Sequence, residues 1–140
     1  MEGCVLGDNV TVGANAVLRM SMIGSGSFVA DTAVVSFSVI GENNFVSTGN
    51  HLVNSMTYPE VFTIHGPYQY SIFGKNAAVF ATINSDIRLD LKTIRIPTAV
   101  GVLDSKQILL GVAYGHRCKI GGSNIIAAGR LVPNDYVLNP

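Results

Sequence analysis

The imidazole side chains are the first candidates for chemistry in this sequence, because imidazole gains and loses a proton near neutral pH and can act as a general base. The chain contains three histidines. His51 follows a Gly-Asn pair, His65 lies near aromatic residues in the segment TIHGPY, and His116 lies in the segment YGHRCKIG. Each histidine is therefore a candidate catalytic base.

Basic side chains are candidates for binding the phosphate groups of a small molecule, because lysine and arginine offset phosphate charge. Five basic residues are candidates of this kind: Lys75, Arg88, Lys92, Arg95 and Arg117. Lys75 and Arg117 are the two that we take as candidate cosubstrate-binding residues. For each residue alone, a solvated surface charge explains the sequence better than phosphate binding does.

A repeat of 17 residues indicates the scaffold that must position these side chains. Segments 6–22, 23–39 and 40–56 align without gaps, and branched apolar residues head units of six, six and five residues in each. These heads are Leu6, Val12 and Leu18, then Ile23, Val29 and Val35, then Ile40, Val46 and Leu52. Glycine follows the first head of every segment, at Gly7, Gly24 and Gly41. Such regularity predicts a repeat architecture.

Six residues are too few for a helix and a turn, but they fit a short strand and a tight corner. Three such units predict one triangular coil of a parallel β-helix, in which the heads of successive coils stack along the axis. The glycine would relieve the corner, where a side chain clashes or a positive φ is needed. An antiparallel β-sandwich is the alternative, and it predicts strict alternation with variable spacing.

The six-residue spacing returns near the C-terminus, over residues 108–138, and it can also be followed through residues 72–85. The later heads are Phe73, Val79, Ile108, Tyr114, Ile120, Ile126, Val132 and Leu138. Residues 57–71 and 86–107 break the spacing and contain three of the five prolines, so we expect them to form two irregular loops. The loops would project from a single β-helix domain, 1–140, whose first coils span residues 4–56.

Composition excludes several classes of protein. Hydrophobic residues make up 48% and charged residues 13% of the chain, with a net charge of zero. The apolar content excludes intrinsic disorder, and the balanced charge disfavours a nucleic-acid partner. No apolar run is long enough to span a membrane and no signal peptide is visible. We therefore expect a cytoplasmic protein with two reduced thiols, Cys4 and Cys118.

The hexads, [Ile/Leu/Val]-Gly-x-x-x-x, resemble those of the hexapeptide-repeat proteins, which form left-handed parallel β-helices. The resemblance covers about residues 4–56 and 108–138. It implies an all-β, left-handed parallel β-helix that assembles as a homotrimer. Members of the family include acyltransferases that use acyl-CoA or acyl carrier protein, γ-class carbonic anhydrases, and the C-terminal halves of sugar-nucleotide pyrophosphorylases. The Ser-Met-Ile-Gly and Ser-Val-Ile-Gly segments are particularly similar to the last group.

The segment around His116 resembles the His-x-Cys-x-[Ile/Val]-Gly segment of the hexapeptide acyltransferases, in which the histidine is the general base. The resemblance also implies an oxyanion-binding glycine about one coil later, but 17 or 18 residues onward lie Pro133 and Asn134, and proline has no N–H. His65 and His51 are the second choices, by similarity to xenobiotic acetyltransferases. The γ-carbonic anhydrases place two zinc-binding histidines about five residues apart, whereas the spacings here are 14 and 51, so we expect no metal site.

Two hypotheses about function follow. The first is an acyltransferase that moves an acyl group from acyl-CoA, a cosubstrate rather than a bound cofactor, to a hydroxyl or amine of a sugar-like small molecule. The loops 57–71 and 86–107 would shape the acceptor pocket. The second is a non-catalytic trimerisation or regulatory module related to sugar-nucleotidyltransferase C-terminal domains. A start in mid-coil favours the second hypothesis, and the segment around His116 favours the first.

Overall fold

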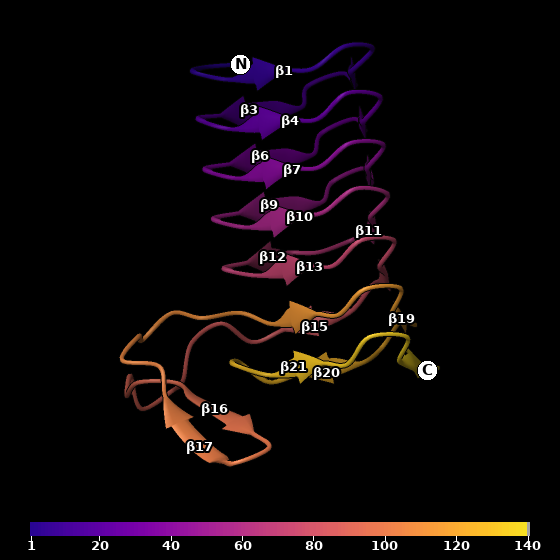
Figure 1. Cartoon of the computed structure of the whole chain (residues 1–140). Coiled ribbons are helices and arrows are strands. Elements are labelled where there is room, and N and C mark those ends of the chain that lie inside the picture. The colour runs from indigo at the N-terminus through magenta and orange to yellow at the C-terminus, as the bar shows by residue number, and fades with distance from the viewer. Residues whose placement is uncertain (140) are drawn as a thin grey trace.

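Short parallel strands stack into a triangular prism in the computed structural model, which describes residues 1–139 (Figure 1). The first face consists of seven strands: β1 (Val5–Leu6), β4 (Met22–Ile23), β7 (Val39–Ile40), β10 (Met56–Thr57), β13 (Ile72–Phe73), β18 (Ala113–Tyr114) and β21 (Leu131–Val132). The second face also has seven: β2 (Thr11–Val12), β5 (Phe28–Val29), β8 (Phe45–Val46), β11 (Phe62–Ile64), β14 (Ala78–Phe80), β19 (Lys119–Ile120) and β22 (Val137–Leu138).

The third face is divided into two sheets. One contains β3 (Val17–Arg19), β6 (Val34–Ser36), β9 (His51–Val53) and β12 (Tyr68–Gln69), and the other contains β15 (Ile83–Asn84) and β20 (Ile125–Ile126). An antiparallel hairpin of β16 (Arg95–Thr98) and β17 (Gly101–Asp104) projects from the stack (Figure 1). The expected all-β parallel β-helix is therefore confirmed, and the antiparallel sandwich is wrong.

The core is a stack of the predicted head residues. Strand partners are equivalent heads of successive coils, as in Leu6, Ile23 and Ile40. Heads enclosed by a coil on each side are buried, whereas Leu6 and Val12 in the first coil are 37% and 38% exposed. Ile108 is an exception: it is 51% exposed and precedes β18, so its assignment as a head was wrong. Stacking of coils therefore buries the apolar side chains.

The corner glycines allow successive coils to approach closely. A Cβ atom on Gly24 would lie 2.5 Å from the carbonyl carbon of Gly41, and one on Gly41 would lie 2.5 Å from that of Tyr58. These glycines do not have positive φ; that conformation occurs two residues later, for example at Gly26 and Asn43. Of the two predicted reasons for glycine, steric clearance between backbones is the correct one.

Residues 57–71 were expected to form a loop, but they continue the coil through β10, β11 and β12. The sequence pattern fails here because the three inward positions carry Thr57, Thr63 and Tyr68 instead of branched aliphatic residues, and all three are buried. Residues 86–107 leave the stack at the corner between the third and first faces and contain the β16–β17 hairpin; we call this segment the arm.

Two buried tyrosines make the fold sensitive to alkaline pH. Burial raises the pKa of Tyr68 to about 12. The pKa of Tyr114 is raised further; burial is the larger cause, and the charge interaction with the neighbouring Tyr68 is the second. An unfolded phenol ionises at its ordinary pKa of 10.0, so the stabilisation is complete below that pH and is lost as pH rises towards the folded values.

We expect the free energy of unfolding to fall above pH 10 by at most about 1.4 kcal/mol per pH unit for each of the two tyrosines. Urea unfolding measured at pH values from about 8 to 12 tests this. A free energy of unfolding that stays constant across this range would contradict it.

Candidate functional site

His116 lies at the corner between the first and second faces, which we call the first corner. Its neighbours Tyr114 and Cys118 point into the core, with 2% and 0% exposure, and His116 points outward as expected. The imidazole is partly buried. The Tyr58 ring lies edge-on to it, with 5.6 Å between ring centroids. The fold therefore fixes His116 on a rigid corner, with one ring edge exposed to solvent.

Backbone hydrogen bonds link His116 to the coils before and after it. The Lys75 N–H donates to His116 Nδ1 at 2.8 Å, and the His116 N–H donates to Asn134 Oδ1 at 2.8 Å. The same arrangement occurs near the N-terminus, where the Asp8 N–H donates to Ser25 Oγ at 3.0 Å. His116 therefore occupies a corner position at which the side chain accepts a hydrogen bond from the previous coil.

The Lys75 contact determines where the imidazole carries its proton. A nitrogen that accepts a hydrogen bond has no proton of its own, so the neutral ring is protonated at Nε2. In this state Nε2 is a donor. To act as a base at Nε2, His116 must move its proton to Nδ1 and turn away from the Lys75 N–H.

The two predicted cosubstrate-binding residues lie beside His116. Lys75 is one coil before it, is exposed and makes no ion pair within residues 1–139. Arg117 instead donates two hydrogen bonds to Asp135, from Nε at 2.6 Å and from Nη2 at 2.9 Å. The Arg117 guanidinium lowers the pKa of Asp135 below its ordinary value. Lys75 is therefore the cation better placed to bind an added anion.

Strand register identifies the residue one coil after His116. Ala113 and Tyr114 pair with Leu131 and Val132, so His116 aligns with Asn134. Unlike proline, Asn134 has a backbone N–H, and this group has no protein partner within residues 1–139. The sequence alone does not show whether this coil has 17 or 18 residues, so it could not distinguish Pro133 from Asn134 as the aligned residue. An N–H donor is therefore present at the aligned position.

The structure does not bring the three histidines together. His51 is exposed at the start of β9 on the third face. His65 is exposed at the corner between the second and third faces, where its backbone N–H donates to Ser47 Oγ at 2.9 Å. Among residues 1–139 no three His, Cys, Asp or Glu side chains form a group that could hold a metal ion.

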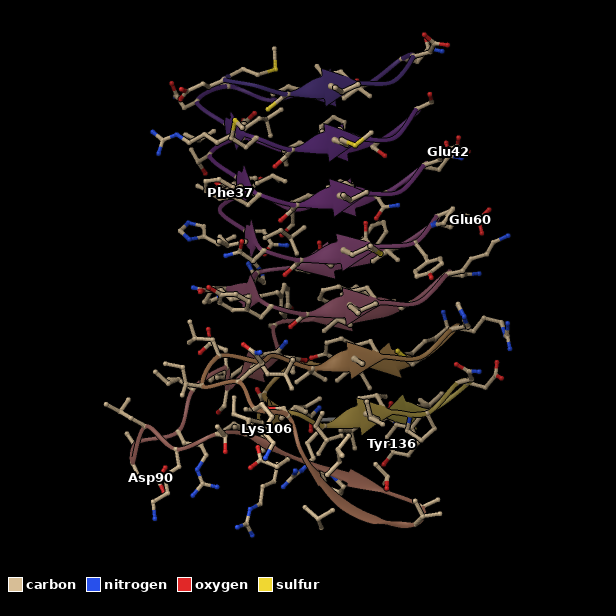
Figure 2. The ribbon with its side chains drawn as sticks, turned by 60° about the vertical axis from the view of Figure 1, so that its left-hand side comes forward. Phe37, Glu42, Glu60, Asp90, Lys106 and Tyr136 are labelled. Carbon is tan, nitrogen blue, oxygen red and sulfur yellow. The ribbon has the colours of Figure 1, made fainter. Side chains whose placement is uncertain are left out.

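The arm and His116 lie at different corners of one chain. The arm connects the third face to the first, whereas His116 connects the first face to the second. Figure 2 shows Asp90 of the arm on the same side as Phe37, away from Glu42 and Glu60 of the first corner. The arm therefore forms no acceptor pocket beside His116 within a single chain, and of residues 57–71 Tyr58 is the one whose ring contacts the imidazole.

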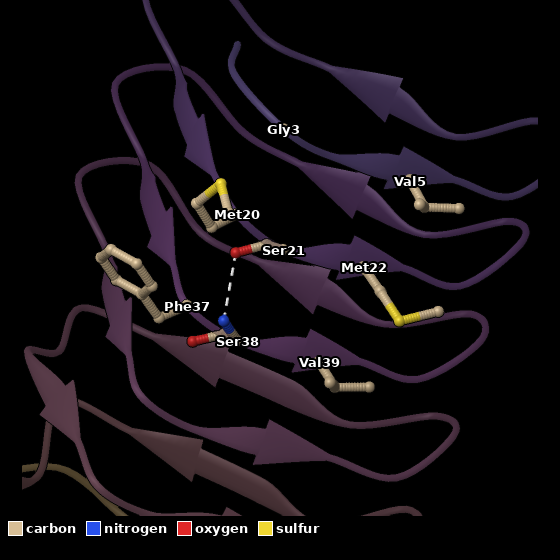
Figure 3. A pocket seen from close by; sticks show the side chains of 8 residues that line it. All are labelled: Gly3, Val5, Met20, Ser21, Met22, Phe37, Ser38 and Val39. Carbon is tan, nitrogen blue, oxygen red and sulfur yellow. Dashed lines mark hydrogen bonds between the residues drawn. The ribbon is translucent and has the colours of Figure 1, made fainter.

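A ladder of buried serines lies along the corner between the third and first faces. The Ser38 N–H donates to Ser21 Oγ at 3.1 Å (Figure 3). The Ser55 N–H likewise donates to Ser38 Oγ at 3.1 Å. Each of the three hydroxyls also donates to the carbonyl group two residues before it. This ladder explains why serine recurs before the apolar-Gly segments, and it assigns these serines a structural role.

Two adjoining grooves follow the outside of this serine ladder, with volumes of about 420 and 430 Å³. They share Phe37 and Val39, and Met20, Met22 and Met56 contribute further apolar surface (Figure 3). No histidine, cysteine, lysine, arginine or acidic residue lines either groove. The grooves therefore offer apolar contact but no acid–base chemistry.

Apolar side chains also form outward rows on two faces. The row on the first face consists of Val5, Met22, Val39, Met56, Ile72 and Leu131, each more than 40% exposed. On the second face, Phe28, Phe45 and Phe62 stack in sequence, with ring centroids 5.6 and 4.5 Å apart. Exposed apolar patches of this extent are typical of surfaces that bind another protein.

Solved structures match the chain, although neither a protein-family model nor a curated protein sequence does. A UDP-N-acetylglucosamine acyltransferase from Arabidopsis matches with a TM-score of 0.52 and 15% identity, over 98% of this chain and 54% of that protein. The fold is a hexapeptide-repeat β-helix.

Two other solved structures match with lower TM-scores. A hexapeptide transferase family protein from Anaplasma phagocytophilum has a TM-score of 0.42 and 16% identity, over 98% of this chain and 64% of that one. A polysialic acid O-acetyltransferase has a TM-score of 0.32 and 14% identity, over 98% of this chain and 75% of that one. The chain thus spans less than two thirds of the first two proteins. No helix long and apolar enough to cross a membrane occurs within residues 1–139.

Proposed function

We propose that this β-helix is an acyltransferase that moves an acyl group from acyl-CoA to a hydroxyl or amine of a sugar-like acceptor, with His116 as the general base. The observation that carries the proposal is the arrangement at the first corner: an outward imidazole, the exposed Lys75 one coil before it, and the Asn134 N–H one coil after it. A base, an anion-binding group and an oxyanion donor are the groups that acyl transfer requires.

In the proposed reaction, His116 Nε2 accepts the proton of the acceptor's hydroxyl or amine. At the same time the oxygen or nitrogen of that group attacks the carbonyl carbon of the thioester. The C–S bond then breaks, and the imidazolium returns the proton to the departing CoA thiolate. Before this step, the histidine proton moves to Nδ1 and the Lys75 N–H loses its acceptor. At an exposed site the lost hydrogen bond costs only about 1 kcal/mol, which is smaller than the gain from general base catalysis.

The site also needs a second copy of the chain, and we propose a homotrimer. A cyclic trimer uses two different patches on each copy, and the apolar rows on the first and second faces supply two. Neighbouring copies would then add to the surface around His116, because the first corner lies between the two packed faces.

Met56→Asp is expected to dissociate the trimer, because it places a charge in the middle of the apolar row on the first face. The mass measured by light scattering should fall from three times the chain mass of 14.8 kDa to a single chain. Val34→Asp, on the third face, is the matched control and should leave the mass unchanged. A wild-type monomer, or a trimer in Met56→Asp, would contradict the assembly.

The acyltransferase proposal is tested by measuring the free thiol released from acetyl-CoA with a panel of sugars and amines. We expect release that depends on both the chain and one class of acceptor. Absence of release with every acceptor, by a trimeric preparation, would contradict the proposal.

A non-catalytic trimerisation or regulatory module is the second candidate function, and the Lys75–His116 hydrogen bond favours it. In that role His116 does what Ser25 and Asn134 do at equivalent corner positions, accepting an N–H from the previous coil. Trimer formation without thiol release, together with unchanged stability in His116→Asn, would support this second function.

A further inference from the structure

A cleft of about 490 Å³ lies between the arm and the last coils, away from the first corner. Ile94, Pro97 and Val102 form much of its apolar wall, with Ala127 and Ala128 of the β20–β21 turn on the other side. Its volume lies within the range that small-molecule sites occupy. The cleft therefore has the size and the apolar surface of a ligand site, formed by two segments that are distant in sequence.

Three arginines line this cleft, two from the arm and one from the β20–β21 turn. Arg88 belongs to the start of the arm, Arg95 begins β16, and Arg130 precedes β21. No carboxylate lines the cleft. Three like charges around one cleft repel one another, and a bound anion would offset this repulsion.

The acidic residues nearby offset the charge of Arg88 and part of that of Arg95. Asp90 accepts from Arg88 Nε at 2.8 Å and from Nη2 at 2.6 Å, which orients the guanidinium and leaves Nη1 free to donate. Asp104 lies opposite Arg95 in the hairpin and is also 3.8 Å from Lys106 Nζ. Arg130 forms no ion pair within the part of the chain that the structure describes.

From this arrangement we infer that the cleft binds a phosphate monoester. Several guanidinium groups suit the doubly charged, three-oxygen head of a monoester, whereas a carboxylate is satisfied by one arginine. The apolar wall would contact the organic part of the ligand. The inference does not depend on the proposed acyl transfer, because the cleft and His116 lie at different corners of the prism.

Calorimetric titration of the wild-type protein with glucose 6-phosphate, inorganic phosphate and glucose tests the inference. We expect glucose 6-phosphate to bind more tightly than inorganic phosphate, glucose not to bind, and the affinity for glucose 6-phosphate to fall as salt is added. Arg130→Met should weaken this binding about tenfold or more, which corresponds to the loss of one charge-assisted hydrogen bond. An unchanged melting temperature would show that the variant is folded.

Two control variants locate the binding. Arg19→Met removes an exposed arginine on the third face, and Arg117→Met removes the arginine beside His116; both should retain wild-type affinity. Absence of glucose 6-phosphate binding, or equal binding by wild type and Arg130→Met, would overturn the inference. Loss of binding in Arg117→Met alone would also overturn it, because it would move the anion to the first corner. The outcomes for wild type and Arg130→Met do not bear on thiol release from acetyl-CoA.

Discussion

His116→Asn is expected to lower the rate of acyl transfer about 10²- to 10⁴-fold, the usual contribution of general acid–base catalysis, while the melting temperature stays close to that of the wild type. Asparagine can accept the Lys75 N–H through its side-chain oxygen, as Asn134 accepts the His116 N–H one coil later. The substitution therefore retains the corner hydrogen bond and removes only the base. Thiol release and thermal unfolding of the same sample measure the two effects.

His116→Ala is the matched comparison, because it removes both the base and the acceptor for Lys75. We expect the same loss of rate as in His116→Asn and a small loss of stability, about 1 kcal/mol or less for an exposed hydrogen bond. If His116→Asn retained the wild-type rate, the catalytic role of His116 would be wrong, and its corner hydrogen bond would be its only role.

Phe73→Ala is expected to destabilise the fold by about 3–5 kcal/mol, the usual cost of removing a fully buried phenylalanine. Phe73 is 0% exposed and stacks on Tyr114, with ring centroids 4.9 Å apart, while Tyr68 contacts it edge-on at 5.4 Å. Two large neighbouring rings cannot collapse readily into the space that alanine leaves. Urea unfolding of wild type and variant at the same protein concentration measures the difference.

Leu89→Ala in the arm is the control for Phe73→Ala. Leu89 is fully exposed, so its truncation should change the free energy of unfolding by no more than about 0.5 kcal/mol. A loss below about 1 kcal/mol in Phe73→Ala would show that the aromatic stack does not contribute as its burial indicates.

The repeat allowed most of the fold to be predicted, because a 17-residue offset places each head within residues 6–56 on its equivalent in the next coil. The prediction failed over residues 57–71, where Thr57, Thr63 and Tyr68 occupy inward positions that the pattern reserves for branched aliphatic residues. The Tyr68 hydroxyl is accommodated by donating to the Ile64 carbonyl at 3.0 Å. A contact of this kind depends on coil geometry and cannot be inferred from spacing.

The candidate site was predicted in part. The outward direction of His116 followed from its position between two inward residues. The residues that surround its side chain could not be predicted in this way. Lys75 is 41 residues earlier, because the arm is inserted between two coils that stack directly. Tyr58 was assigned to a loop, and Asn134 could not be distinguished from Pro133. The cleft lined by Arg88, Arg95 and Arg130 likewise depends on how the arm folds back, which no repeat in the sequence specifies.

The mass of the acceptor after incubation with acetyl-CoA tests the proposed acyl transfer most directly, because thiol release can also result from simple thioester hydrolysis. With the wild-type protein, we expect the acceptor to gain one acetyl group for each CoA released. His116→Asn, with its corner hydrogen bond retained, should leave the acceptor mass unchanged over the same time. An unmodified acceptor in the wild-type reaction, or equal acetylation by both proteins, would contradict catalysis by His116.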